Sequence, residues 1–130
     1  NGELFDEGVE ASILKSLEPA YIEGLTLLGG DPFEEENQKA LLPFLRKVRE
    51  QYPKKSIWAY TGYVLETDLS SGGRKHTDDT DEMLEYIDVL VDGPFIEAQK
   101  NISLKFKGSE NQRVIDVNQY RKTGEIVAKF

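Results

Sequence analysis

Short apolar runs and longer amphipathic segments alternate along this chain of 130 residues. Three short runs, each followed by a glycine turn, predict buried strands at residues 25–28, 56–60 and 88–91. Three segments with apolar residues at helical spacing predict helices at residues 8–17, 34–52 and 80–86. Helices that alternate with buried strands are typical of βα units on a parallel sheet, so the pattern predicts an α/β domain.

The other segments are less regular. Residues 113–117 (RVIDV) alternate as a strand does, and residues 125–129 are a candidate for one more strand. Pro43 lies within the second predicted helix and indicates a kink there, or two helices in place of one. A polar loop is expected at residues 68–80, and Thr80 is expected to cap the helix that follows.

The length and the charge of the chain limit the classes of protein to which it can belong. Residues 1–130 are enough for a single domain with its own hydrophobic core. The 24 acidic and 16 basic residues leave a net charge of −8, which disfavours partners such as nucleic acids and membrane surfaces. No apolar run reaches the roughly 20 residues that span a bilayer. Asn1 to Asp6 lack the features of a signal peptide, so a cytoplasmic location is expected.

The sequence lacks the residue types that several kinds of catalytic and metal site require. The chain contains no cysteine, which excludes disulfides, thiolate nucleophiles and cysteine-ligated metals within these residues. Its single histidine, His76, excludes a zinc site built on a histidine pair. We therefore predict no catalytic residue and no metal ligand in this chain.

Three turns follow the predicted parallel strands and should meet at one edge of the sheet, where α/β proteins bind ligands. They are Gly29-Gly30-Asp31-Pro32, Thr61-Gly62-Tyr63 and Asp92-Gly93-Pro94. In the first turn the glycines let a ligand approach the backbone, and Pro32 has no N–H, so carbonyl and carboxylate oxygens dominate. Such acceptors suit a cation, for example an ammonium group, better than phosphate. The alternative is that the glycines only turn the chain tightly at the end of a strand.

Four segments carry a resemblance to a known family: GLTLLGGDPF, IWAYTGY, DVLVDGPF and FKGSENQRVIDV. In this order and spacing, from about Gly24 to Val117, the chain resembles the activating proteins of anaerobic ribonucleoside-triphosphate reductase, which are radical S-adenosylmethionine enzymes. The resemblance implies a partial (βα) barrel and a four-iron four-sulfur cluster held by a CxxxCxxC loop. It also implies reductive cleavage of S-adenosylmethionine, which generates a glycyl radical on the partner, the catalytic subunit of the reductase.

The resemblance also assigns residues to the cofactor. Those expected to contact S-adenosylmethionine are Gly29, Gly30, Asp31, Thr61, Gly62 and Asp92. The first three would receive the ammonium group, in agreement with the acceptor-rich turn. Thr61 and Gly62 would lie near the methionyl carboxylate or the ribose, and Asp92 would line the same cavity.

The missing cysteines are the main departure from the family pattern. The simplest interpretation is a fragment that lacks the first strand and the cluster loop, and that would be inactive by itself. Loss of a first strand would expose the edge of its neighbour, which predicts self-association through that edge. One alternative is a cluster-free degenerate homologue that acts as a ligand- or protein-binding module. Others are an activase of another glycyl-radical enzyme, which the GSENQR segment disfavours, and a plain α/β ligand-binding domain.

Two further features have a structural and a functional interpretation. Asn111-Gln112-Arg113 precedes a predicted strand, and we expect a hydrogen-bonded turn there rather than a contact with the reductase. Trp58 lies in an alternating strand and is expected to pack in the core.

Overall fold

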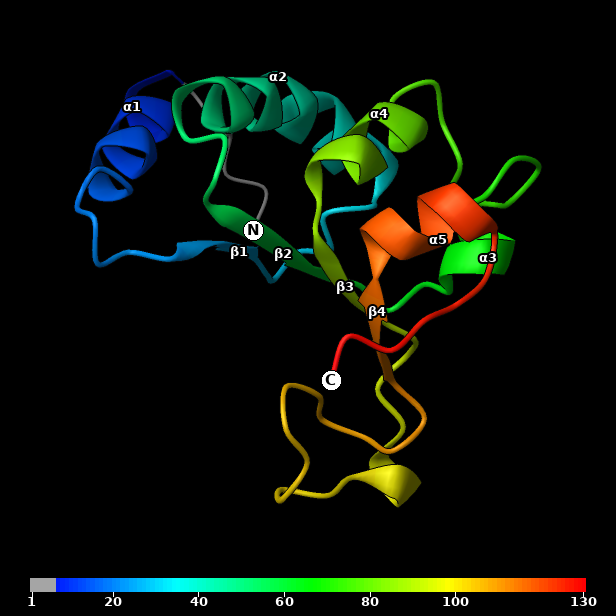
Figure 1. Ribbon diagram of the computed structural model, residues 1–130. Coiled ribbons are helices and arrows are strands. Elements are labelled where there is room, and N and C mark those ends of the chain that lie inside the picture. The colour runs from blue at the N-terminus through cyan, green and yellow to red at the C-terminus, as the bar shows by residue number, and fades with distance from the viewer. Residues whose placement is uncertain (1–6) are drawn as a thin grey trace.

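The computed structural model describes residues 7–130, and residues 1–6 lie outside the described part (Figure 1). The elements are α1 (Glu7–Ser16), β1 (Gly24–Leu27), α2 (Glu35–Gln51), β2 (Ser56–Tyr60), α3 (Leu65–Asp68), α4 (Thr80–Tyr86), β3 (Val89–Asp92), a 3₁₀ turn (Glu97–Gln99), β4 (Arg113–Asp116) and α5 (Val117–Thr123). No helix in this part of the chain combines the length and the apolarity needed to cross a membrane.

The four strands form one open sheet in the order β1-β2-β3-β4. The first three strands are parallel, and β4 is antiparallel to β3. The antiparallel return follows from the connection, because the segment between β3 and β4 holds only a 3₁₀ turn and no crossover α-helix. The prediction of an α/β domain with three parallel strands is confirmed. Consequently the carboxyl ends of β1, β2 and β3 lie at one edge of the sheet.

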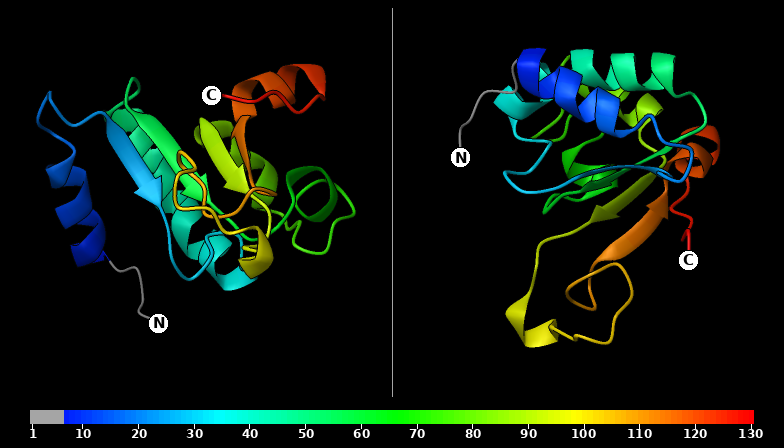
Figure 2. Two further views of the ribbon diagram at one scale, coloured as in Figure 1. Left: turned by 90° about the horizontal axis from the view of Figure 1, so that it is seen from below. Right: turned by 90° about the vertical axis from the view of Figure 1, so that its left-hand side faces the viewer.

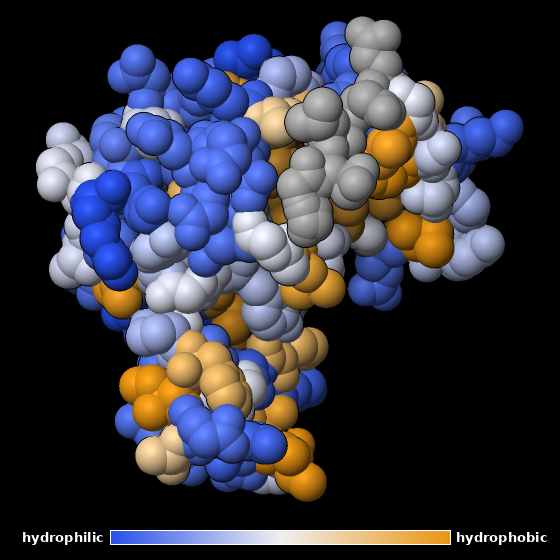
Figure 3. Space-filling model, turned by 180° about the vertical axis from the view of Figure 1, so that it is seen from behind, coloured by the Kyte–Doolittle hydropathy of each residue, from blue (hydrophilic) through white to orange (hydrophobic). Residues whose placement is uncertain are grey.

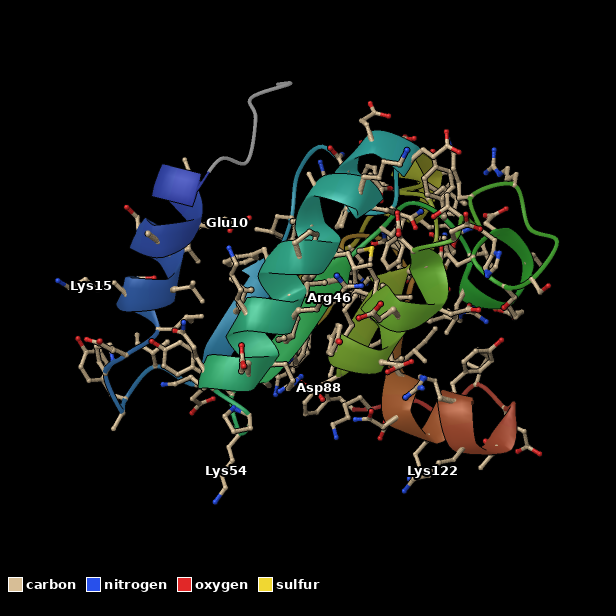
Figure 4. The ribbon with its side chains drawn as sticks, turned by 90° about the horizontal axis from the view of Figure 1, so that it is seen from above. Glu10, Lys15, Arg46, Lys54, Asp88 and Lys122 are labelled. Atoms are coloured by element: carbon tan, nitrogen blue, oxygen red, sulfur yellow. The ribbon has the colours of Figure 1, made fainter. Side chains whose placement is uncertain are left out.

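The main core lies between the sheet and a layer of helices. Helices α1, α2 and α4 cover one face of the sheet, as the side view and the view from above both show (Figures 2 and 4). Each strand turns alternate residues toward this layer, and three of them, Ile57 in β2, Leu90 in β3 and Ile115 in β4, have no exposed surface. Helix α2 contributes Phe44 and Leu45, which are equally buried or nearly so.

A second, smaller apolar cluster lies on the other face of the sheet. It contains Val89, Val91 and Val114, with Trp58 and Phe106 packed against them. Trp58 is therefore packed as expected, although it is only half-buried. Its ring lies 4.9 Å from that of Phe106 and 5.8 Å from that of Phe130.

The segment 93–112, called the arm below, projects from the sheet beyond the end of β3 (Figure 1). It carries the 3₁₀ turn and leads back into β4. The side view shows the arm pointing away from the helical layer (Figure 2).

Several expectations about single elements are wrong. The first strand is not fully buried, because β1 pairs only with β2 among the described residues and Leu28 is 61% exposed. Helix α2 continues through Pro43, so the two-helix alternative is wrong. Residues 125–129 make only an isolated bridge, between Ala128 and Ile115. The short helices α3 and α5 were not predicted. Self-association through the outer edge of β1 stays a prediction.

Thr80 is buried rather than a cap, and it belongs to a polar network around Gln38. The amide nitrogen of Gln38 donates to the carbonyls of Phe33 and Lys75, both at 2.9 Å. Its amide oxygen accepts from the hydroxyls of Thr77 and Thr80, at 3.0 and 2.5 Å. Because Gln38 has no exposed surface, these four bonds replace those that it would make with water. The network fastens the loop before α4 to helix α2.

The variant Gln38→Leu should lower the free energy of unfolding by about 2–4 kcal/mol, because it leaves buried carbonyl and hydroxyl groups without partners. Urea denaturation checks this. The matched control is Gln51→Leu, at the exposed end of the same helix, where a change below about 0.5 kcal/mol is expected. Equal changes in both variants would contradict the role assigned to the network.

Candidate functional site

The carboxylate of Asp31 joins the turn after β1 to the turn after β2. Its Oδ1 accepts from the Thr61 hydroxyl at 2.8 Å and from the Phe33 N–H at 3.0 Å. Its Oδ2 accepts from the Gly62 N–H at 2.9 Å. The Thr61 hydroxyl oxygen also accepts from the Tyr63 N–H at 3.1 Å. The two turns are thus held in a fixed relation by a single side chain.

The backbone of the first turn presents two carbonyls to one point. Gly30 and Asp31 both have positive φ, 73° and 32°, a region that glycine adopts at little cost. The amide nitrogen of Asn37 donates to both of their carbonyl oxygens, and the bond to Asp31 is 2.8 Å long. A Cβ placed on Gly29 would meet no atom within 4 Å. The turn is therefore open at Gly29 and rich in acceptors at Gly30 and Asp31.

Four charged or polar side chains form a wall beside this turn. The Tyr63 hydroxyl donates to Glu34 at 2.7 Å, and the Lys75 ammonium donates to the other oxygen of the same carboxylate at 2.8 Å. Both cations of the loop lie over the Tyr63 ring, Arg74 at 5.0 Å and Lys75 at 5.3 Å from its centroid. The bond from Lys75, and then that from Tyr63, hold the pKa of Glu34 below its ordinary value of 4.5.

At the end of β3, Asp92 has no exposed surface. Its Oδ2 accepts from the Leu65 N–H at 2.8 Å and from Arg113 at 2.6 Å, and its Oδ1 accepts from Arg113 at 2.9 Å. Arg113 also donates to both oxygens of Glu66 in α3. Its bonds with Asp92, and then those with Glu66, raise the pKa of its guanidinium. Arg113 and the Leu65 N–H therefore engage both carboxylate oxygens of Asp92. Its contact with a ligand stays a prediction.

The Asn111-Gln112 segment fastens the base of the arm. The Asn111 amide donates to the Pro94 carbonyl at 2.8 Å, and the Gln112 amide donates to the Gly93 carbonyl at 2.9 Å. The oxygen of Gln112 accepts from the Gly108 N–H at 2.8 Å. The expected hydrogen-bonded turn is confirmed.

The structure brings most of the predicted site residues together. Asp31, Thr61 and Gly62 are in direct contact, and Gly29 and Gly30 belong to the same turn as Asp31. Asp92 lies one strand further along the sheet and reaches the others only through the backbone of the second turn and α3. The sequence reasoning missed Glu34, Asn37, Arg74 and Lys75, and it named Tyr63 only as a member of the second turn. Asn37 had a local signal, since a short amide in the first turn of a helix can bond back to the preceding turn.

The described residues do not fit an iron–sulfur cluster. Clusters of this type are held by cysteine thiolates, and the 130 residues contain no cysteine. Among residues 7–130, no three histidine, aspartate or glutamate side chains gather as a metal site would require. The acceptors at Gly30 and Asp31 suit an ammonium group, because each N–H of that group can point at one oxygen.

Loss of the guanidinium in Arg113→Ala should lower the free energy of unfolding by about 3 kcal/mol, because it leaves the buried Asp92 carboxylate without its partner. Thermal or urea denaturation measures this. Arg121→Ala is the control, since Arg121 reaches Glu85 only at 3.8 Å and both side chains are largely exposed; a change below about 1 kcal/mol is expected there. A small effect of Arg113→Ala would show that Asp92 does not need this partner.

The lowered pKa of Glu34 predicts a dependence of stability on pH. A carboxylate whose pKa is lower in the folded state stabilises the fold above its unfolded value of 4.5. This contribution is lost as the pH falls through the folded pKa. Wild type should therefore exceed Glu34→Gln in stability near pH 7, and the difference should shrink below pH 4.5. Denaturation at several pH values tests this, and a difference that is constant with pH would refute it.

Comparison of the sequence with known proteins identifies its family. A family model described as a 4Fe-4S single cluster domain matches residues 1–115. Relatives named anaerobic ribonucleoside-triphosphate reductase-activating protein include those of Haemophilus influenzae, Pasteurella multocida and bacteriophage T4. They are 44%, 41% and 36% identical; the matches cover 85%, 89% and 88% of this chain and 68%, 71% and 66% of the relatives. No solved structure matches. This chain belongs to the family of anaerobic ribonucleoside-triphosphate reductase-activating proteins.

Proposed function

We propose that this chain takes part in the activation of an anaerobic ribonucleoside-triphosphate reductase and binds S-adenosylmethionine at the carboxyl edge of its sheet. The observation that carries the proposal is the first turn, where the carbonyl oxygens of Gly30 and Asp31 both accept from the side-chain amide of Asn37. The ammonium group of the methionyl moiety would be bound by these acceptors. Gly29 leaves the space through which the ligand approaches the backbone.

The neighbouring turns would complete the binding site. Thr61 and Gly62 would lie near the methionyl carboxylate or the ribose, held in place by their bonds to Asp31. Asp92 would act at the margin of the same site. Its carboxylate is engaged by Arg113 and Leu65, so we infer that it orients the end of β3 more than it contacts the ligand. We also propose that the open sheet is one wall of a partial (βα) barrel.

The chemistry of activation is a finer part of the proposal. When cleaved reductively, S-adenosylmethionine supplies the group that generates a glycyl radical on the catalytic subunit of the reductase. The electron would come from a four-iron four-sulfur cluster, and its cysteine ligands cannot come from these 130 residues. We therefore assign binding of the ligand and recognition of the reductase to this chain, and no step of the radical chemistry. The missing cysteines equally favour a second candidate, a cluster-free binding module of the same family.

Calorimetric titration of the whole chain with S-adenosylmethionine tests the proposal. Asp31→Ala removes three hydrogen bonds that shape the acceptor turn, and roughly tenfold weaker binding is expected from the loss of one such bond or more. Asp78→Ala changes an exposed carboxylate elsewhere and should leave the affinity unaltered. No measurable binding by wild type, or equal affinity in both variants, would reject this site.

A further inference from the structure

The C-terminal part of the chain, residues 94–130, differs in net charge from the rest of the chain. Residues 94–130 hold seven of the 16 basic residues but only four of the 24 acidic ones. That leaves a net charge of +3 on these residues, against −11 on the other 93. A basic region on an acidic protein attracts acidic partners, because charges of opposite sign raise the rate of encounter.

The arm concentrates part of this charge beside an anchored ring. Phe106 has a positive φ of 70° and packs against Trp58 and Phe130. The lysines on either side of it, Lys105 and Lys107, make no ion pair with any described carboxylate. Lys105 is exposed, with its ammonium over the Phe106 ring at 5.4 Å from the centroid, and Lys107 donates only to backbone carbonyls within its own loop. Both charges are therefore available to a partner.

A groove runs between the arm and the C-terminal segment of the chain. Its lining includes the basic Lys105 and Lys107, the apolar Val114, Ile126 and Phe130, and one acidic side chain, Glu110, which accepts a hydrogen bond from the Asn101 amide. Phe130 is 69% exposed, and Ile102 on the arm is 94% exposed. Hydrophobic and hydrophilic residues lie side by side on the projecting arm (Figure 3). The groove therefore combines a basic rim with an apolar lining, as protein interfaces often do.

Hydrogen bonds within the arm fix its conformation in the absence of a partner. Its base is closed by the side chains of Asn111 and Gln112. Further along, the Glu110 N–H donates to the Gln99 carbonyl at 3.0 Å, and the Ile96 N–H donates to the Ser109 hydroxyl at 3.2 Å. A surface that is ordered in advance loses less conformational entropy on binding.

We propose that this groove is the docking site for a segment of the reductase catalytic subunit that carries acidic and apolar residues. This proposal rests on the proposed function. The two lysines complement acidic side chains, and the lining between them accepts apolar ones. The arm follows directly from β3, whose end lies at the same edge as the Asp31 turn. A subunit held on the arm is thereby held beside the proposed binding site. Phosphate chains of nucleic acid fit less well, because the chain as a whole is acidic.

The test measures binding of the immobilised reductase catalytic subunit to the whole chain. The double variant Lys105→Glu, Lys107→Glu should bind about tenfold more weakly, and Lys105→Glu alone about threefold, with most of the loss in the association rate at low salt. The control is Lys15→Glu, Lys54→Glu, which makes the same change in net charge on two exposed lysines, one in the last turn of α1 and one in the turn after α2 (Figure 4). It should change affinity less than about twofold.

The fluorescence of Trp58, the single tryptophan, verifies the fold beside the arm in each variant. If wild type does not bind the subunit, the proposed function itself fails. If wild type binds and both double variants lose the same affinity, the effect is one of net charge and the groove is rejected. Binding of heparin that depends on Lys105 and Lys107 and that leaves the subunit bound would identify a site for polyanions and would also overturn the proposal.

Discussion

The parallel pairing of three short strands is the constraint on which the rest of this structure depends. It places the ends of β1, β2 and β3 at one edge, and at two of these ends a carboxylate bonds to a neighbouring segment. Asp31 holds the turn after β2, and Asp92 holds the start of α3 together with β4. An edge made of loops is thereby given fixed geometry, which a binding site requires.

The sequence predicted the elements whose signal is local. The runs at 25–28, 56–60 and 88–91 were predicted as strands, because a short apolar run that ends in a glycine turn is typical of a buried strand. The burial of β1 was overestimated because its exposure depends on its place at the sheet edge, which its own residues do not encode. Helix α5 was missed because it follows β4 without a break, and only the bond from the Gln119 N–H to Asp116 marks its start.

The candidate site divides in the same way. Gly29, Gly30 and Asp31 could be found because glycine and aspartate at a strand end are visible in a short window. The pair of Glu34 with Lys75 joins residues 41 positions apart, and Gln38 meets Lys75 across 37 positions. No periodicity or motif predicts contacts between residues so far apart in the sequence, because these contacts form only when the loop before α4 packs against α2.

The Gln38 network also determines how this part of the molecule can move. The loop before α4 has no regular structure of its own, yet its Lys75 carbonyl shares one buried amide with the carbonyl of Phe33, the residue that follows the Gly29–Pro32 turn. The loop cannot detach while that amide stays bonded, so the turn and the loop form one cooperative unit of local unfolding. Amide protons on the two segments should therefore exchange with solvent through a common opening event, in which the bonds of the Gln38 amide are broken.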